Sequence, residues 1–189
     1  MYLANSLIVN KEGVMESLIE RISAYNIFNN IIPGAVFCYF FNLFFTVNLG
    51  GEGTIYNLCL FYFWGVFVSR IGSLFIEKAS IKLKFVRYAH YGDYLKASRV
   101  DEDIKMFLEV NNMLRTFASV FLCLGFTHFL SFVVERFDVK WFVLQEFSIV
   151  GSMVSVFLFL IMMFAYRKQT SYIVKRVEKQ ISQSSISEG

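Results

Sequence analysis

Four long stretches of the chain contain no charged residue. They run over 22–51, 53–69, 116–134 and 147–166, and most of their positions are apolar. Each is close to or longer than the ~18 residues that a helix needs to cross a bilayer. Pro33 and Gly34 suit the start of a helix or a kink, so we begin the first span close to them, at about residue 31. The pattern therefore predicts an all-α integral membrane protein with four transmembrane helices, at about 31–49, 54–76, 116–134 and 147–166.

The segments outside these runs also show helical spacing. Apolar positions over 14–25 predict an amphipathic helix along the membrane surface. Between the second and third runs, a basic and aromatic stretch precedes an apolar stripe. We expect the second and third membrane helices to extend into the cytoplasm there as a helical hairpin around 91–103. The segment after Arg167 reads as a short basic amphipathic helix.

Basic residues are distributed unevenly between these segments. Of the 18 Lys and Arg residues, 15 lie before the first run, over 78–115, or after the fourth run. Short loops rich in Lys and Arg stay on the cytoplasmic side. The sequence thus predicts one membrane domain over 1–189, with both termini inside, a cytoplasmic stalk at 77–115 and a cytoplasmic tail at 167–189.

The overall composition agrees with a membrane location. The chain is 56% hydrophobic and 19% aromatic, which favours burial against lipid. Its net charge of +3 is small, so we expect no direct binding of nucleic acid. Cys38, Cys59 and Cys123 lie inside apolar runs without a CxxC pair, which argues against both disulfides and zinc.

No set of residues with catalytic chemistry stands out. His90 and His128 are the only histidines, and the predicted topology separates them. The sequence has no phosphate-binding loop, nucleophile elbow or zinc-protease motif. We therefore expect no enzyme activity, catalytic residue, metal site or cofactor. Asp101, Glu102 and Asp103 are consecutive, point in different directions on a helix, and suit a solvated helix start.

Small residues recur at every fourth position in two of the predicted spans. In lipid, such faces let helices approach closely and let hydroxyl groups bond across helices. We interpret them as packing faces within or between protomers, and a weakly polar pore lining is the alternative. The residues are Gly65, Ser69 and Ser73 in the second span and Ser119, Cys123, Thr127 and Ser131 in the third.

Two ionisable side chains fall within the predicted spans. Arg70 lies near the inner end of the second span, where it can snorkel to the headgroups, and a gating or pairing role is the alternative. His128 suits a hydrogen-bonded membrane histidine more than a proton relay or a ligand.

Three short motifs resemble a known group of proteins. NNIIPG at 29–34, YLKAS at 94–98 followed by Asp101, and NNMLRT at 111–116 are similar to the small four-span membrane proteins of bacterial anti-phage operons, above all the membrane subunits of the Kiwa system. The resemblance implies a homo-oligomer, with a tetramer as a candidate, in the bacterial inner membrane. It also implies a sensor of phage attack that holds a soluble cytoplasmic effector, and it carries over no catalytic motif.

These observations favour a sensor and scaffold whose cytoplasmic stalk docks a soluble partner. Arg and Tyr often dominate interface energetics, and acidic residues flank them here. The alternative for each residue is a surface that faces headgroups or solvent. A pore-forming effector that depolarises the infected cell is the alternative function, whereas an enzyme or a transporter finds little support. The docking candidates are Arg87, Tyr91, Tyr94, Arg99, Asp101, Glu102, Asp103 and Lys105.

Overall fold

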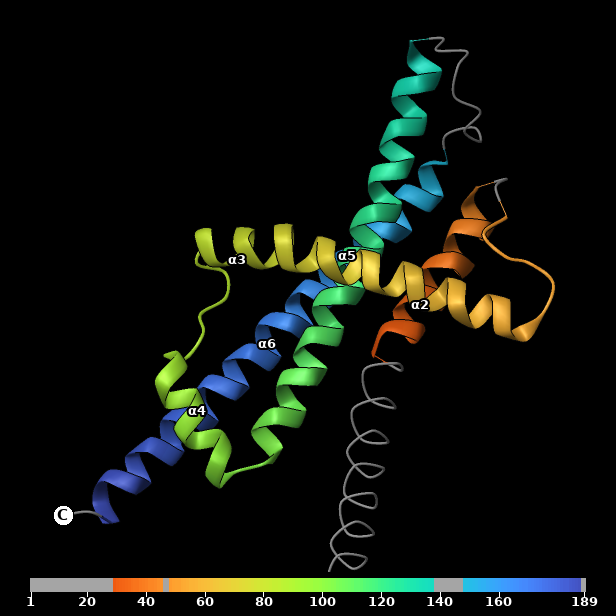
Figure 1. Ribbon diagram of the computed structural model, residues 1–189. Helices are drawn as coiled ribbons and strands as arrows, with labels where there is room; N and C mark the ends of the chain where they lie inside the picture. The colour runs from red at the N-terminus through yellow and green to blue at the C-terminus, as the bar shows by residue number, and fades with distance from the viewer. Residues whose placement is uncertain (1–28, 46–47, 138–147, 188–189) are drawn as a thin grey trace, which may run out of the picture.

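The computed structural model describes residues 29–45, 48–137 and 148–187. Within these ranges the chain is helical with short connections and contains no strand, so the all-α prediction is confirmed there. The amphipathic helix predicted at 14–25 lies outside the described residues. In chain order the elements are a helix at 29–44, α2 (Thr54–Ile71), the π-helix η1 (Gly72–Glu77), α3 (Lys78–Lys82), α4 (Tyr91–Val100), α5 (Asp103–Arg136) and α6 (Ile149–Ser187) (Figure 1).

Three helical stretches are long and apolar enough to cross a membrane. They are Thr54–Lys82, Asp103–Arg136 and Ile149–Gln183, and they coincide with the second, third and fourth predicted spans. Large apolar side chains cover their outer faces: Phe126 is 58% exposed and Phe157 is 63% exposed. Apolar surface of this extent is unfavourable in water and suits contact with lipid. By their length and composition, these three helices could therefore cross a membrane.

In the described part of the remaining predicted span, residues are helical only as far as 44. The described helical stretch at 29–44 covers about 24 Å at 1.5 Å per residue, and residues 48–53 are not helical. A helix normally needs about 20 residues to span the hydrocarbon core. A fourth transmembrane helix, and the side of the membrane on which the termini lie, therefore stay predictions.

The helices α5 and α6 form an antiparallel pair along most of their length. His128 lies against Gly151 near one end, Thr170 Oγ1 lies 3.0 Å from Asn111 Oδ1 in the middle, and Ile104 packs in one cluster with Val177 at the other end. As residue numbers fall along α5 they rise along α6, as an antiparallel register requires. This pair is the longest helix–helix contact in the described structure.

A continuous helical stretch from Thr54 to Lys82 crosses this pair instead of running alongside it (Figure 1). The crossing brings Gly72 of η1 against α5, where a Cβ atom on Gly72 would lie 2.5 Å from Ser119 Oγ. The π-helical turns of η1 interrupt the α-helical register at this point, as π segments often do at functional positions. The described helices therefore do not form a simple bundle of parallel rods.

A second close crossing joins the helix at 29–44 to α2. A Cβ atom on Gly34 would lie 1.8 Å from the carbonyl oxygen of Phe61, and one on Gly65 would lie 1.8 Å from that of Asn30. Only glycine allows two backbones to approach this closely. Beside the crossing, an apolar core unites both helices with α5, through Phe37, Cys38, Phe45, Val68, Val120, Phe121 and Leu124.

The predicted cytoplasmic hairpin differs in how it is built. The second membrane helix ends at Lys82, and residues 83–90 are not helical. The chain then forms α4 as a separate helix, which turns at Asp101 into α5. Lys84 has a φ of 55°, a left-handed conformation that ends the preceding helix and reverses the chain. The hairpin thus consists of α4 and α5, and it packs against α6 of the same chain.

Candidate functional site

The end of the molecule farthest from the 29–44 helix is a three-helix module, which we call the platform. It consists of α4, residues 103–115 of α5 and residues 167–187 of α6. Its core contains Ala97 from α4, Ile104 from α5, and Ile173 and Val177 from α6, all buried. Together with the partly buried Tyr94, Phe107 and Ile181, these positions recur three or four residues apart on each helix, so each helix presents one apolar stripe to the others. The apolar stripe at the start of α5 therefore packs within the chain.

An ion-pair network fastens the platform at the turn between α4 and α5. The Arg176 guanidinium donates to Asp101 through Nε at 2.6 Å and Nη2 at 3.0 Å, and to Asp103 through Nη2 at 2.8 Å. Gln180 adds a hydrogen bond to Asp101 at 3.2 Å. The Arg176 guanidinium also lies over the Phe107 ring, 5.0 Å from its centroid. The hydrogen bonds from Arg176 lower the pKa of the Asp101 carboxyl below its ordinary value.

The predicted docking residues divide between the core and the surface of the platform. Asp101 and Asp103 are engaged by Arg176, and Tyr94 packs half-buried against the platform core. Asp103 is nonetheless exposed to solvent, as are five other candidates, two of which share the outer face of α4. The other five are Arg87, Tyr91, Arg99, Glu102 and Lys105.

The outer face of α4 forms a short mixed stripe. Tyr91, Leu95 and Arg99 follow one another at intervals of four residues, which places them on one side of the helix. Tyr91 is 72% exposed, although an aromatic ring usually gains from burial. We call these three residues the α4 stripe. It is an exposed surface on a helix whose opposite side is held in place by the platform core.

A polar cluster that sequence reasoning missed lies where η1, α5 and α6 meet. Arg115 Nη1 donates to the Glu77 carboxylate, and the hydroxyls of Tyr88 and Tyr166 are hydrogen-bonded to each other. Burial and the Tyr166 hydroxyl raise the pKa of Tyr88 above its ordinary value of 10.0. Glu77 and Arg115 have opposite charges, and they flank the second and third predicted spans. The opposite charges at these two positions are the feature of the sequence that indicates the ion pair.

The two small-residue faces are used for packing inside the chain. Gly65 meets the 29–44 helix, and Ser119 meets Gly72 of η1. The hydroxyls do not bond across helices: those of Ser73, Ser119, Thr127 and Ser131 each donate to the carbonyl four residues earlier in their own helix. That carbonyl is within reach of any helical Ser or Thr, so the bond needs no partner helix. Ser69 and Cys123 are partly buried on the same faces.

The two ionisable residues within the predicted spans have contrasting surroundings. His128 is 1% exposed, with the rings of Phe44 and Phe45 centred 5.1 and 4.8 Å away. Its Nε2 atom has no hydrogen-bond partner among the described residues, so the predicted hydrogen bond is not seen for that atom. Arg70 is exposed and makes no hydrogen bond or ion pair with a described residue. Snorkelling of its side chain to the lipid headgroups therefore stays a prediction.

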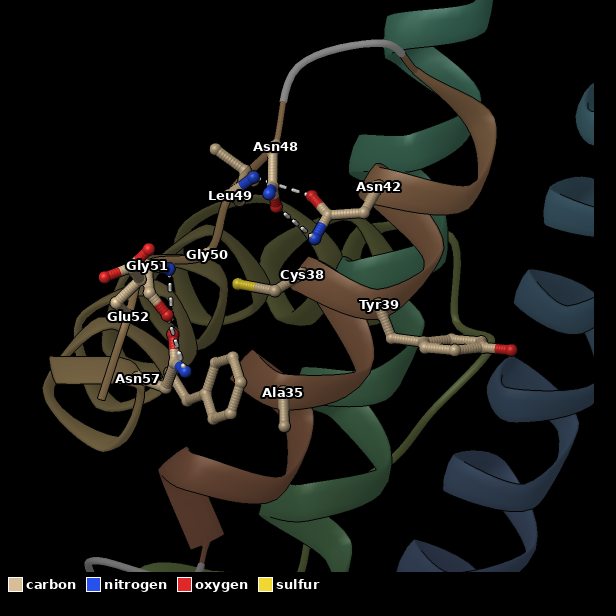
Figure 2. A pocket seen from close by; sticks show the side chains of 11 residues that line it. Ala35, Cys38, Tyr39, Asn42, Asn48, Leu49, Gly50, Gly51, Glu52 and Asn57 are labelled. Atoms are coloured by element: carbon tan, nitrogen blue, oxygen red, sulfur yellow. Dashed lines mark hydrogen bonds between the residues drawn. The ribbon is translucent and has the colours of Figure 1, made fainter. Parts of the chain in front are cut away.

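An open pocket of about 570 Å³ lies at the opposite end, beside the turn before α2. Figure 2 shows the Asn42 side chain reaching from the 29–44 helix toward that turn. Its Oδ1 accepts from the Leu49 backbone N at 2.7 Å, and its Nδ2 donates to Asn48 Oδ1 at 3.1 Å. Asn57 Nδ2 donates to the Gly51 carbonyl at 3.1 Å. Amides therefore fix the turn, and Glu52 is the one charged residue in the lining.

Comparison of the chain with protein-family models, with curated proteins and with solved structures finds no match. Within the described ranges, no group of three or more His, Cys, Asp or Glu side chains is placed to hold a metal ion. The candidate site is therefore assigned from the geometry of the platform alone.

Proposed function

We propose that this protein is a membrane-embedded scaffold whose platform docks a soluble protein. The observation that carries the proposal is the α4 stripe: Tyr91, Leu95 and Arg99 point outward from a helix that the Asp101–Arg176 network holds in place. A rigid surface loses little conformational entropy on binding, and Tyr and Arg are the residues that most often dominate interfaces.

The cytoplasmic position of the platform is part of the proposal. It is supported by the excess of Lys and Arg in 78–115 and 167–179, which favours the cytoplasmic side. The short motifs similar to anti-phage membrane subunits suggest the class of partner. In this view the protein is a homo-oligomeric sensor in a bacterial inner membrane, and the partner is the soluble effector of a defence system.

A pore is the alternative, and it depends on the polar face of α5. Ser119 and Ser131 on that face are 0% and 2% exposed within one chain, and their hydroxyls are bonded to their own helix. A pore would therefore require a path between copies of the chain or a rearrangement of these helices. We favour the scaffold because its surface is already exposed.

Co-purification from native membranes tests the proposal. The tagged full-length protein is extracted gently, and the soluble protein that accompanies it in a fixed ratio is identified and quantified. We expect Tyr91→Ala with Arg99→Glu to lower that ratio at least about tenfold, as truncation of interface hot spots does. Lys179→Glu is the matched control, since it reverses an exposed charge elsewhere on the platform and should leave the ratio unchanged.

The outcomes separate the two functions. Equal loss in both variants would mean that general charge, and not the α4 stripe, holds the partner. If the protein purifies alone and its expression depolarises cells, the scaffold is wrong and the pore is favoured.

A further inference from the structure

A basic groove lies between the segment after α3 and the helix α6. Its volume is about 390 Å³. Four of its lining residues are cations and Glu178 is its one acid, so the groove favours an anion. The lining comes from two parts of the chain: Lys84, Phe85, Val86 and Arg87 from the first, and Arg167, Ser171, Val174, Lys175 and Glu178 from the second.

An apolar groove of about 490 Å³ adjoins it on the side of the membrane helices. Its lining contains no charged residue, and its one polar side chain, Ser80, has a buried hydroxyl without a hydrogen-bond partner among the described residues. Phe85 lines both grooves, so they adjoin at its ring. The remaining apolar lining residues are Phe75, Ile76, Ala79, Leu83, Leu122, Phe159, Leu160, Met163 and Phe164.

The junction between the grooves is held in a defined shape. The Arg167 guanidinium lies 4.9 Å from the centroid of the Phe85 ring, a cation–π contact between the two walls. The Ser80 carbonyl accepts from the backbone N of Phe85 at 2.9 Å and of Val86 at 3.2 Å. Together with the left-handed backbone of Lys84, these bonds turn the segment back toward α6. The basic residues are therefore placed by the fold and not by a free loop.

We propose that the two grooves together bind one anionic phospholipid. The phosphate lies in the basic groove among Lys84, Arg87, Arg167 and Lys175, and an acyl chain lies in the apolar groove. A basic groove alone suits any phosphate, and an apolar groove alone suits any hydrocarbon. Only an amphiphile with a charged head matches both at one junction.

The position along the chain fits a lipid. Arg167 is the first charged residue after the uncharged run 147–166, so it stands where a membrane helix reaches the headgroups. Basic pockets between membrane helices at this level are the usual sites for anionic headgroups. This proposal rests on the chain being embedded in a membrane and is independent of whether the platform docks a partner.

Two measurements on the full-length protein in detergent micelles test the site. The first is native mass spectrometry, which should show one retained phospholipid per chain after mild delipidation. The second is binding of fluorescent phosphatidylglycerol, with unlabelled phosphatidylglycerol, phosphatidylcholine and inorganic phosphate as competitors. We expect only phosphatidylglycerol to compete well.

Matched variants locate the site. Arg167→Gln with Lys175→Gln should weaken binding about tenfold or more, because two cations near the headgroup are lost. Lys168→Gln with Lys179→Gln removes the same charge from α6 outside the basic groove, and binding should stay within about twofold. Ala79→Trp fills the apolar groove and should also weaken binding of the lipid.

Several results would overturn the proposal. Equal weakening in both pairs of cation variants would indicate attraction by the whole basic surface. Competition by inorganic phosphate as strong as that by phosphatidylglycerol would assign the basic groove to a soluble anion. If the wild-type protein retains no lipid and the competitors act equally, the proposed lipid site is wrong. This test does not depend on whether the variants fold.

Discussion

The Arg176 guanidinium makes a bidentate ion pair with the Asp101 carboxylate, with Nε 2.6 Å from Oδ2 and Nη2 3.0 Å from Oδ1. The two residues are 75 positions apart in the chain. Paired hydrogen bonds of this geometry fix orientation as well as distance. This ion pair therefore fixes the orientation of the turn between α4 and α5 on α6. The orientation of that turn in turn sets the direction in which the α4 stripe faces.

The thermal stability of the platform should depend on the charge of Asp101. Its folded-state pKa lies below the ordinary value of 3.8, so the carboxylate stabilises the fold above that pH. This contribution is lost as the pH falls through the folded-state pKa. We expect the Tm of Asp101→Asn in micelles to be lower than that of the wild type at pH 6. The two Tm values should converge below pH 3.8, and a difference independent of pH would contradict the assignment.

The helix crossing at Gly34 and Gly65 should not tolerate a methyl group. A Cβ at position 65 would lie 1.8 Å from the carbonyl oxygen of Asn30, so Gly65→Ala must separate the two backbones. We expect a loss of about 1–3 kcal/mol in the free energy of unfolding, measured by SDS titration of micelles. Gly125→Ala is the control: its nearest neighbour would be Ser155 Cβ at 3.9 Å, and alanine favours a helix. A loss of equal size in the control would refute the crossing.

Removal of one partner of the Glu77–Arg115 pair should lower the free energy of unfolding more than removal of both. The Arg115 side chain is 12% exposed, so Glu77→Leu leaves a mostly buried charge without its carboxylate. We expect a loss of about 1–3 kcal/mol in unfolding free energy. Glu77→Leu with Arg115→Leu should recover part of it, because a buried charge is no longer unpaired. Additive losses in this double-mutant cycle would mean that the two side chains do not interact.

The buried contact between Thr170 and Asn111 should respond to the loss of one hydroxyl. Thr170 Oγ1 lies 3.0 Å from Asn111 Oδ1 and 2.9 Å from the Tyr166 carbonyl oxygen. Thr170→Val keeps the shape but leaves the buried Asn111 amide without this partner. It should lower the unfolding free energy by about 1–3 kcal/mol, whereas Thr170→Ser retains the hydroxyl and should lower it less. Equal effects of Val and Ser would assign the loss to packing alone.

The helices themselves were largely predictable, because each long helix follows from a local pattern. An uncharged apolar run marks a helix that lipid can surround, and the spans predicted at 54–76, 116–134 and 147–166 overlap the long helices Thr54–Lys82, Asp103–Arg136 and Ile149–Gln183. The platform was only partly predictable. Periodicity indicated that residues 104–114 carry an apolar stripe, but it could not show that Ile173 and Val177 of α6 cover that stripe. The sequence also predicted that the second membrane helix extends toward residue 91, whereas in the structure the helix ends at Lys82.

The sequence by itself predicted helices long and apolar enough to cross a membrane, because hydrophobicity and helical period are properties of neighbouring residues. Tertiary structure alone decided which side chains meet. Glu77 and Arg115 are 38 positions apart, and Asp101 and Arg176 are 75 apart. The placement of the basic groove beside the apolar groove likewise depends on how α3 and α6 approach each other. Contacts across such separations arise from how the helices cross, and no local pattern in the sequence encodes a crossing.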